Sequence, residues 1–275
     1  MTPNSSALSG AVLSLLAFSL YSLNDITIKF LGGSYHPVQI LFFSGMAGFP
    51  LVVLQMMADR EGGSMRPVMW NFTLARMAIV IVNGLLVSYA FATLPLSEAY
   101  AIFFMMPLFI CVLAVPLLGV IIVLRPGVMD LNWAHLAALA GASFGALYYI
   151  ILRKTGGRER MAVLMLYPMM AQTAFVALFL PLVYEPMPAA HLGLLGLMAL
   201  EGFVGTLFMV WAYRAAPAVV VAPMQYVQII VATLFSTLYF HEPMDAYTVA
   251  GIAVIIGAGL FIMTRPKPAE VVPTV

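Results

Sequence analysis

The strongest constraint on this chain is a series of apolar stretches, each about 20 residues long. An α-helix rises 1.5 Å per residue, so about 20 apolar residues cross the roughly 30 Å hydrocarbon core of a bilayer. In this sequence 63% of the residues are hydrophobic and 8% are charged, whereas about 25% of the residues in a soluble domain are charged. The sequence therefore predicts an all-α integral membrane protein and excludes a water-soluble fold.

The apolar stretches predict nine full transmembrane helices in one bundle. We place them at residues 7–31, 38–57, 74–94, 97–115, 132–152, 162–183, 192–213, 217–240 and 246–264. Short connections make neighbouring helices antiparallel and leave no room for a soluble domain. Residues 1–10 contain no Lys or Arg, so we expect the first apolar stretch to remain as a membrane helix and not to be removed as a secretory signal.

Basic residues predict how the bundle is oriented in the membrane. Arg60 and Arg66, with Arg76 at the next helix start, mark one basic segment, and residues 153–160 contain a second. The loops at 184–191 and 241–245 contain no Lys or Arg. Because short loops rich in Lys and Arg stay in the cytoplasm, we expect both basic segments and the C-terminus there.

The two halves of the chain are related by a weak repeat, which predicts units at 1–127 and 128–275. Residues 89–95 and 211–217 share a pattern of aromatic, Ala, aromatic and Pro at an offset of 122 residues. Residues 119–126 match 259–266, but at an offset of 140. The first unit therefore lacks about 18 residues between 107 and 119, close to the length of one helix.

The length of this shortened region and the distribution of basic residues give different numbers of membrane crossings. The 26 uncharged residues between Glu98 and Arg125 are enough for one tilted span. Placing both Arg66 and Arg153 in the cytoplasm requires an even number of crossings between them. A single span in this region would bring the total to three, together with the spans at 74–94 and 132–152. Three alternatives remain: a full helix followed by a half-span stub near 117–124, a single helix with a frustrated topology, or a truncated, transport-inactive copy. We favour the stub, which has to pack inside the bundle because lipid cannot satisfy re-entrant backbone.

Several segments resemble EamA-type transporters of the drug/metabolite transporter superfamily. Residues 216–226, 240–245 and 251–265 resemble the last two helices of that family, and 94–99 and 124–127 resemble its first-half signatures. The resemblance implies two inverted five-helix repeats, a substrate cavity near the membrane midplane and alternating access. Members of the family carry amino acids, riboflavin-like vitamins, nucleotide derivatives and drugs.

This chain departs from the family pattern in two places. Helices four and five are shortened and fused, which places the inverted symmetry in doubt. The second helix of the family often carries an Arg where this chain has residues 42–44, Phe-Phe-Ser. Any role of that Arg is therefore not carried over.

Charged groups inside a span are costly, on the order of 2.5 to 3.5 kcal/mol at the centre, so they are candidates for function. Asp25 and Lys29 share one helix face and form either a structural ion pair or a site in which Asp25, with Asn24, faces the cavity and binds an amine or a proton. Glu201 lies in the middle of a span without a basic residue within a helical turn. It is either a neutral carboxyl bonded to a neighbouring helix or a proton-coupling site. Asp25 and Glu201 are the coupling candidates.

Polar and aromatic groups at matching depth in the two units predict the substrate pocket. Tyr100 and Phe103 align through the repeat with Ala222 and Gln225, and glutamine amides need hydrogen-bond partners that lipid cannot supply. Aromatic walls with few charges suit a flat or amphipathic solute. The predicted substrate-binding residues are Asn24, Asp25, Tyr100, Phe103, Phe104, Tyr148, Tyr149, Glu201, Gln225, Tyr226 and Gln228.

Other notable residues have structural interpretations. Glu98, after Ser97, favours a helix start. Gly141 and Gly145, four residues apart, favour close helix packing. Pro107 and Pro223 interrupt helices near the predicted pocket, either as hinges or as ordinary membrane prolines.

The sequence favours a carrier over other classes of membrane protein. No nucleophile and base converge at one depth, so an embedded enzyme is disfavoured. The four histidines lack the spacing of a metal site, Cys111 is the single cysteine, and a net charge of +1 indicates no nucleic-acid partner. We predict a carrier of a small organic metabolite across the inner membrane, without cofactor or metal. A homodimer remains open, as does the alternative of an inactive paralogue or scaffold protein.

Overall fold

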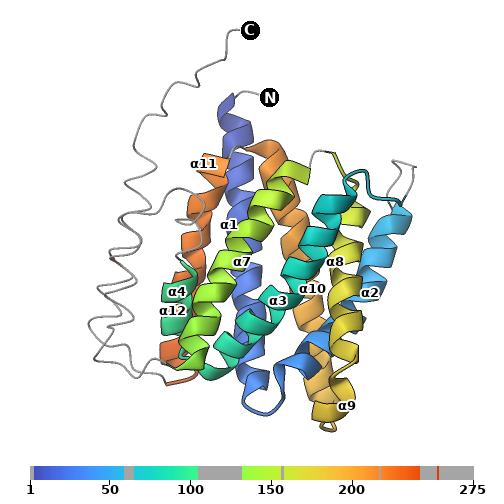
Figure 1. Ribbon diagram of the computed structural model, residues 1–275. Helices are drawn as coiled ribbons and strands as arrows, with labels where there is room; N and C mark the ends of the chain where they lie inside the picture. The colour runs from blue at the N-terminus through green and yellow to red at the C-terminus, as the bar shows by residue number, and fades with distance from the viewer. Residues whose placement is uncertain are drawn as a thin grey trace.

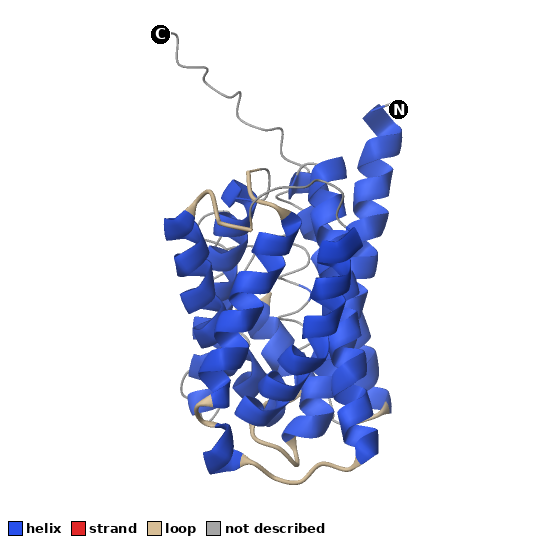
Figure 2. Ribbon diagram, turned by 90° about the vertical axis from the view of Figure 1, so that its right-hand side faces the viewer, coloured by secondary structure: helices blue, strands red, loops and turns tan. Residues whose placement is uncertain are grey.

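The computed structural model describes residues 3–58, 65–104, 132–155, 158–216, 218–241 and residue 253. Helices make up all of the regular secondary structure in these parts of the chain, as Figure 2 shows. The helices stand side by side, with connecting segments at the two ends of the bundle (Figures 1 and 2). The all-α membrane fold predicted from hydropathy is therefore confirmed.

Five of the described helices are long and apolar enough to cross a bilayer. They are α1 (Pro3–Gly32), α2 (Pro37–Ala58), α3 (Trp70–Thr93), α7 (Trp133–Thr155) and α10 (Ala189–Ala215). The shorter helices are α4 (Leu96–Phe103), α8 (Met161–Ala177), α9 (Leu180–Val183), α11 (Ala218–Val221) and α12 (Val227–Leu238). A 3₁₀ segment, η1, covers Ala222–Tyr226 between α11 and α12.

Prolines divide two of the spans that we predicted from hydropathy, and the interruption at Pro223 was itself predicted. The span at 162–183 consists of α8 and α9, with Pro181 in the first turn of α9. The span at 217–240 consists of α11, η1 and α12, with Pro223 at the start of η1. Proline has no N–H and its ring clashes with the preceding turn, so it fits the first turn of a new helix better than a helix interior. Pro107, the other predicted interruption, lies outside the described residues.

Contacts at one end of the bundle bring the two basic segments together. Glu159 accepts hydrogen bonds from the backbone N–H groups of Val68, at 3.1 Å, and Met69, at 2.6 Å. At the opposite end, Gln39 and the backbone of Glu185 exchange two hydrogen bonds of 2.6 and 2.9 Å. The basic segments before α3 and before α8 therefore lie at the same end, as the charge pattern predicts.

Helices α4 and α7 begin at the end opposite to Glu159. Their first turns meet through Glu98 and His135, whose side chains are 3.5 Å apart. Two turns further along α7, a Cβ placed on Gly141 would lie 3.0 Å from the ring of Phe103, near the end of α4. The two helices therefore run parallel, and both start at the end away from the basic segments.

This arrangement answers the conflict between length and charge. A single net crossing between residues 96 and 132 would place the first turns of α4 and α7 at opposite ends of the bundle, and they lie together. The charge rule is therefore satisfied. The shortened region at 107–119 and the stub expected near 117–124 lie outside the described residues.

Helix α1 is the central element of the bundle, with α3, α10 and α12 packed around it (Figure 1). Small residues allow close approach at two points. A Cβ on Gly32 would lie 2.5 Å from the Cβ of Ala92 in α3, and one on Gly205 in α10 would lie 2.8 Å from the ring of Tyr21. These contacts hold the half of α1 that carries Asn24 and Asp25 against α3 and α10.

The orientation can be tested by cysteine labelling in a Cys111→Ser background. We expect Val68→Cys and Arg158→Cys to react from the cytoplasmic face and Trp133→Cys to react from the other face, because α7 crosses the membrane between Trp133 and Arg158. Trp133 and Val68 are 78% and 76% exposed, so each position is accessible. Labelling of Trp133→Cys and Arg158→Cys from the same face would contradict the fold.

Candidate functional site

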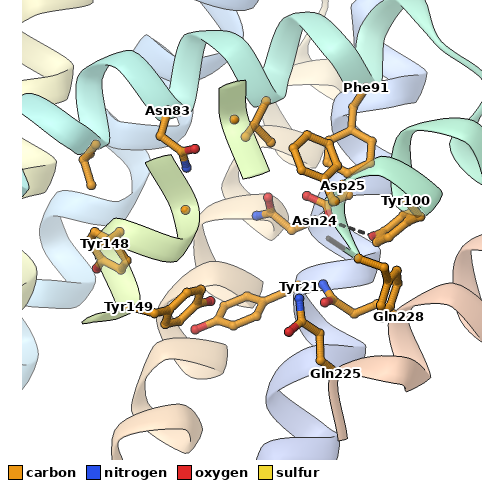
Figure 3. A pocket seen from close by; sticks show the side chains of 16 residues that line it. Tyr21, Asn24, Asp25, Asn83, Phe91, Tyr100, Tyr148, Tyr149, Gln225 and Gln228 are labelled. Carbon is orange, nitrogen blue, oxygen red and sulfur yellow. Dashed lines mark hydrogen bonds between the residues drawn. The ribbon is translucent and has the colours of Figure 1, made fainter. Parts of the chain in front are cut away.

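A cavity of about 240 Å³ lies in the bundle between α1, α3, α4, α7 and the η1–α12 segment. We call it the aromatic cavity. Figure 3 shows its side chains converging from these separate elements. Its lining consists of Tyr21, Asn24, Asp25, Val80, Asn83, Val87, Phe91, Tyr100, Phe103, Phe104, Gly141, Gly145, Tyr148, Tyr149, Gln225 and Gln228.

Asp25 is the acidic group of the aromatic cavity. Its Oδ2 accepts a 2.6 Å hydrogen bond from the Tyr100 hydroxyl, which is itself 3.3 Å from Ser22 Oγ. The Lys29 ammonium donates a 2.6 Å bond to the Leu94 carbonyl, so the two members of the proposed ion pair have other partners. Within the described parts of the chain, Asp25 has no ionic partner. Its carboxylate is therefore available to a cation in the cavity.

Aromatic rings form the walls around this carboxylate. The ring centroid of Phe91 lies 5.1 Å from that of Tyr100 and 5.0 Å from that of Phe103. On the α7 side, the rings of Tyr148 and Tyr149 are 5.6 Å apart, and Figure 3 shows Tyr149 next to Tyr21. The negative face of an aromatic ring attracts a cation, so these walls and Asp25 favour the same kind of ligand.

Amide side chains complete the polar part of the aromatic cavity. Gln225 and Gln228 come from η1 and α12 and are 9% and 8% exposed. Asn83 presents an Oδ1 atom without a hydrogen-bond partner among the described residues. Amides both donate and accept hydrogen bonds, so they suit the edge of a heterocyclic ring or a polar substituent.

Nine of the eleven residues predicted from the sequence line the aromatic cavity. Tyr226 lies behind the wall, where its ring stacks on Phe104 at a centroid distance of 5.3 Å. Glu201 also lies outside the lining. Sequence reasoning missed Tyr21, Asn83 and Phe91. Tyr21 lies one helical turn before Asp25 on the same face of α1, and this spacing is the signal that identifies it.

Glu201 is buried in the middle of α10, with 8% of its surface exposed. Its Oε2 atom has no hydrogen-bond partner among the described residues. Three residues earlier on α10, the Met198 carbonyl accepts a 2.8 Å bond from the Asn24 amide on α1. Glu201 therefore lies close to the α1–α10 contact, beside the helix that carries Asp25.

A second cavity of about 280 Å³ adjoins the first, between α1, α2, α3, α8 and α10. We call it the methionine cavity because Met165, Met169 and Met198 form part of its lining. The two cavities share three residues, which are Asn24, Val80 and Tyr148. They are therefore neighbouring chambers separated by a few side chains.

Arg76 is buried at this junction, although the sequence assigned it only to a basic segment at a helix start. It is 2% exposed, and its Nη2 donates to the Tyr148 hydroxyl at 3.1 Å and to the Leu164 carbonyl at 2.8 Å. Its guanidinium carbon lies 5.1 Å from the centre of the Tyr148 ring. The approach of α7 and α8 to α3 decides this burial, and the charge pattern alone does not reveal it.

Two further predicted features have defined places. Glu98 lies in the first turn of α4, where an acid favours the positive end of the helix dipole, and it faces His135. The side chain of Ser97 lies outside the described residues. In the described parts of the chain, no three His, Cys, Asp or Glu side chains gather as metal ligands would.

Comparison with known proteins agrees with this architecture. Residues 132–264 match the EamA-like transporter family. The chain is 26% identical to an S-adenosylmethionine uptake transporter of Rickettsia prowazekii, over 94% of both proteins. It is 24% identical to the pseudopaline exporter CntI of Pseudomonas aeruginosa, over 94% of this chain and 97% of the exporter. The second half of this chain therefore contains an EamA-like transporter domain.

The family match and the relatives agree on the broad class of activity. Both relatives match nearly the whole chain and are named as transporters, which supports a multi-pass membrane transporter of a small molecule and not an enzyme. A solved crystal structure, 18% identical, superposes with a TM-score of 0.63 over 94% of this chain and 96% of that chain, and it shares the fold.

The bond between Tyr100 and Asp25 makes a testable contribution to stability. We expect Tyr100→Phe to lower the thermal stability of the detergent-solubilised protein by a few degrees, because a buried hydrogen bond contributes about 1 kcal/mol. Tyr89→Phe is the matched control, since Tyr89 is 40% exposed. Equal melting temperatures for the two variants would show that the Tyr100 hydroxyl does not stabilise the site.

Proposed function

We propose that this EamA-type transporter carries a small organic cation with a flat ring, of the S-adenosylmethionine kind, across the inner membrane by alternating access. The observation that carries this proposal is the Asp25 carboxylate, which faces a cavity walled by aromatic rings and has no ionic partner among the described residues. A cation loses its hydration on entering such a site, and its interactions with the carboxylate and with several ring faces replace the lost contacts with water.

The chemistry of the aromatic cavity narrows the substrate classes that the family suggests. Riboflavin-like vitamins are uncharged, and nucleotide derivatives carry anionic phosphates that Asp25 would repel. A sulfonium or ammonium group is attracted by Asp25, while the amides of Gln225 and Gln228 can bond the edge of a base. The relatives named as S-adenosylmethionine uptake transporters support this choice.

The broken span of residues 218–238 supports a carrier mechanism. The η1 segment interrupts regular helix where Gln225 meets the aromatic cavity, and discontinuous helices at the membrane midplane are typical of carrier binding sites. Rotation of one unit against the other, with α1 as the central contact, would expose the cavity to each side in turn. The break would then act as a hinge, which is one of the two interpretations that the sequence left open for Pro223.

Transport in proteoliposomes tests the proposed substrate class. We expect time-dependent uptake of labelled S-adenosylmethionine, and weaker or no uptake of neutral amino acids, riboflavin and nucleosides. Asp25→Asn removes the charge and should reduce uptake about tenfold or more, since a charge-assisted contact is worth roughly 1.5–3 kcal/mol. Glu185→Gln removes one negative charge from an exposed position and is the control.

The same assay decides between a carrier and the inactive alternative. Folded, monodisperse protein that moves none of these probes would support a transport-inactive paralogue or a scaffold protein. Uptake that Asp25→Asn leaves unchanged would retain the carrier and reject Asp25 as the cation site.

Glu201 is our candidate for proton coupling. Its burial beside the α1–α10 contact and its unpartnered Oε2 support a group that binds and releases a proton during the cycle. We expect Glu201→Gln, which keeps the size and the hydrogen-bonding capacity of the side chain, to abolish uptake or to make it independent of pH. Uptake with the wild-type pH profile would show that Glu201 is a neutral structural residue.

A further inference from the structure

Two buried charges of opposite sign border the two neighbouring cavities. Asp25 lines the aromatic cavity. Arg76 contacts Tyr148 and Leu164, and both of these residues line the methionine cavity. Neither Asp25 nor Arg76 has an ionic partner in the parts of the chain that the structure describes. A charge buried in a membrane protein is costly, so each is expected to have a counter-charge during function.

The positions of the two charges define a span across both cavities. Helices α1 and α3 both run toward the end of the bundle where Gly32 packs on Ala92. Asp25 lies seven residues before Gly32, which places it near the level of residue 85 on α3. Arg76 lies nine residues before residue 85, which is about 13 Å along the axis of α3. Val80, one turn from Arg76, lines both cavities. An elongated substrate can therefore reach both charges.

The hydroxyl of Tyr148 connects Arg76 to the cavity space. It accepts a hydrogen bond from Arg76, so its own hydrogen is available for another acceptor. Tyr148 lines both cavities, and no acceptor for its hydroxyl hydrogen occurs among the described residues. The adjacent guanidinium polarises this hydroxyl, which makes it a stronger donor. In addition, Arg76 Nε has no hydrogen-bond partner in the described structure.

We propose that Arg76 and Tyr148 form a carboxylate-binding subsite, and that the substrate is a zwitterion whose cationic group lies at Asp25. The inference rests on the proposed function, because it places the second charge of the same substrate. Tyr148 donates its hydroxyl hydrogen to the carboxylate, and Arg76 supplies the positive charge. The substrate then neutralises both buried charges at once, which a simple cation does not.

The remaining polar lining of the methionine cavity fits this assignment. Asn24, Ser44, Gln172 and Thr206 line it, and the described residues of its lining include no acidic side chain that would repel a carboxylate. The Gln172 amide donates a 3.1 Å bond to the Val80 carbonyl. The amides of Asn24 and Gln172 each use one N–H in a hydrogen bond to a backbone carbonyl, so each has a second N–H that can bond an anionic group.

A pair of probes that differ by one carboxylate tests the subsite. S-adenosylmethionine carries the carboxylate, and its decarboxylated form retains the sulfonium, the amine and the adenosine. We expect the wild-type protein in proteoliposomes to transport the first with a lower KM. Arg76→Gln and Tyr148→Phe should raise the KM for S-adenosylmethionine, by about 10- to 100-fold and several-fold respectively, and should change the KM for the decarboxylated probe by a clearly smaller factor.

Two further variants separate this role from general effects. Arg158→Gln removes one positive charge at the same end of the bundle from an exposed position, and should leave both KM values unchanged. Asp25→Asn should raise the KM for both probes, because both contain the sulfonium. Tyr148→Phe keeps Arg76 and its bond to Leu164, so it remains informative if Arg76→Gln does not fold.

The outcomes distinguish the subsite from the proposed function. Equal KM values of the wild-type protein for the two probes would overturn the carboxylate subsite and leave cation transport intact. The subsite is also overturned if the folded Arg76 and Tyr148 variants raise both KM values by the same factor, which is the result of a purely structural role. Failure of the wild-type protein to transport either probe would reject the proposed function and this inference with it.

Discussion

The bilayer's inability to hydrogen-bond is the constraint on which the rest of this structure depends. Lipid leaves every buried polar group to find its partner inside the bundle. Lys29 donates to the Leu94 carbonyl, Asp25 accepts from Tyr100, and Arg76 donates to Tyr148 and Leu164. Each of these contacts ties one helix to another. The few polar side chains of an apolar chain therefore determine how its helices are arranged around the interior.

The same constraint explains where the helices are interrupted. Breaks at Pro181 and Pro223 occur where the chain begins a new helical segment, so proline removes no hydrogen bond that a continuous helix needs. The break at Pro223 has a functional consequence, because it leads into the segment that presents Gln225 and Gln228 to the aromatic cavity. Close packing at Gly32 and Gly205 holds α1 at the centre, where its polar residues meet both cavities.

The proposed function rests on an uneven distribution of a small number of charges. One chamber has a carboxylate among aromatic rings, and its neighbour is bordered by a buried guanidinium. Such an interior favours a solute that brings charges of the opposite sign to the same places. We propose that a cation with a flat ring binds in the first chamber and that a carboxylate on the same solute binds at the junction with the second. In this proposal Glu201, beside the central helix, links substrate binding to proton movement.

Hydropathy and charge in the sequence alone determined the all-α membrane fold, the orientation of its basic segments and most of the cavity lining, including Asp25, Tyr100 and Gln225. These features are readable because a bilayer sets helix length and because polar groups avoid lipid. Only the tertiary structure decided that Tyr226 lies behind the wall, that Lys29 bonds Leu94 and that Arg76 is buried at the junction of two cavities. Such contacts join residues far apart in the chain, as Asn24 and Met198 are, and helical periodicity specifies a face of one helix but not the neighbour that it meets.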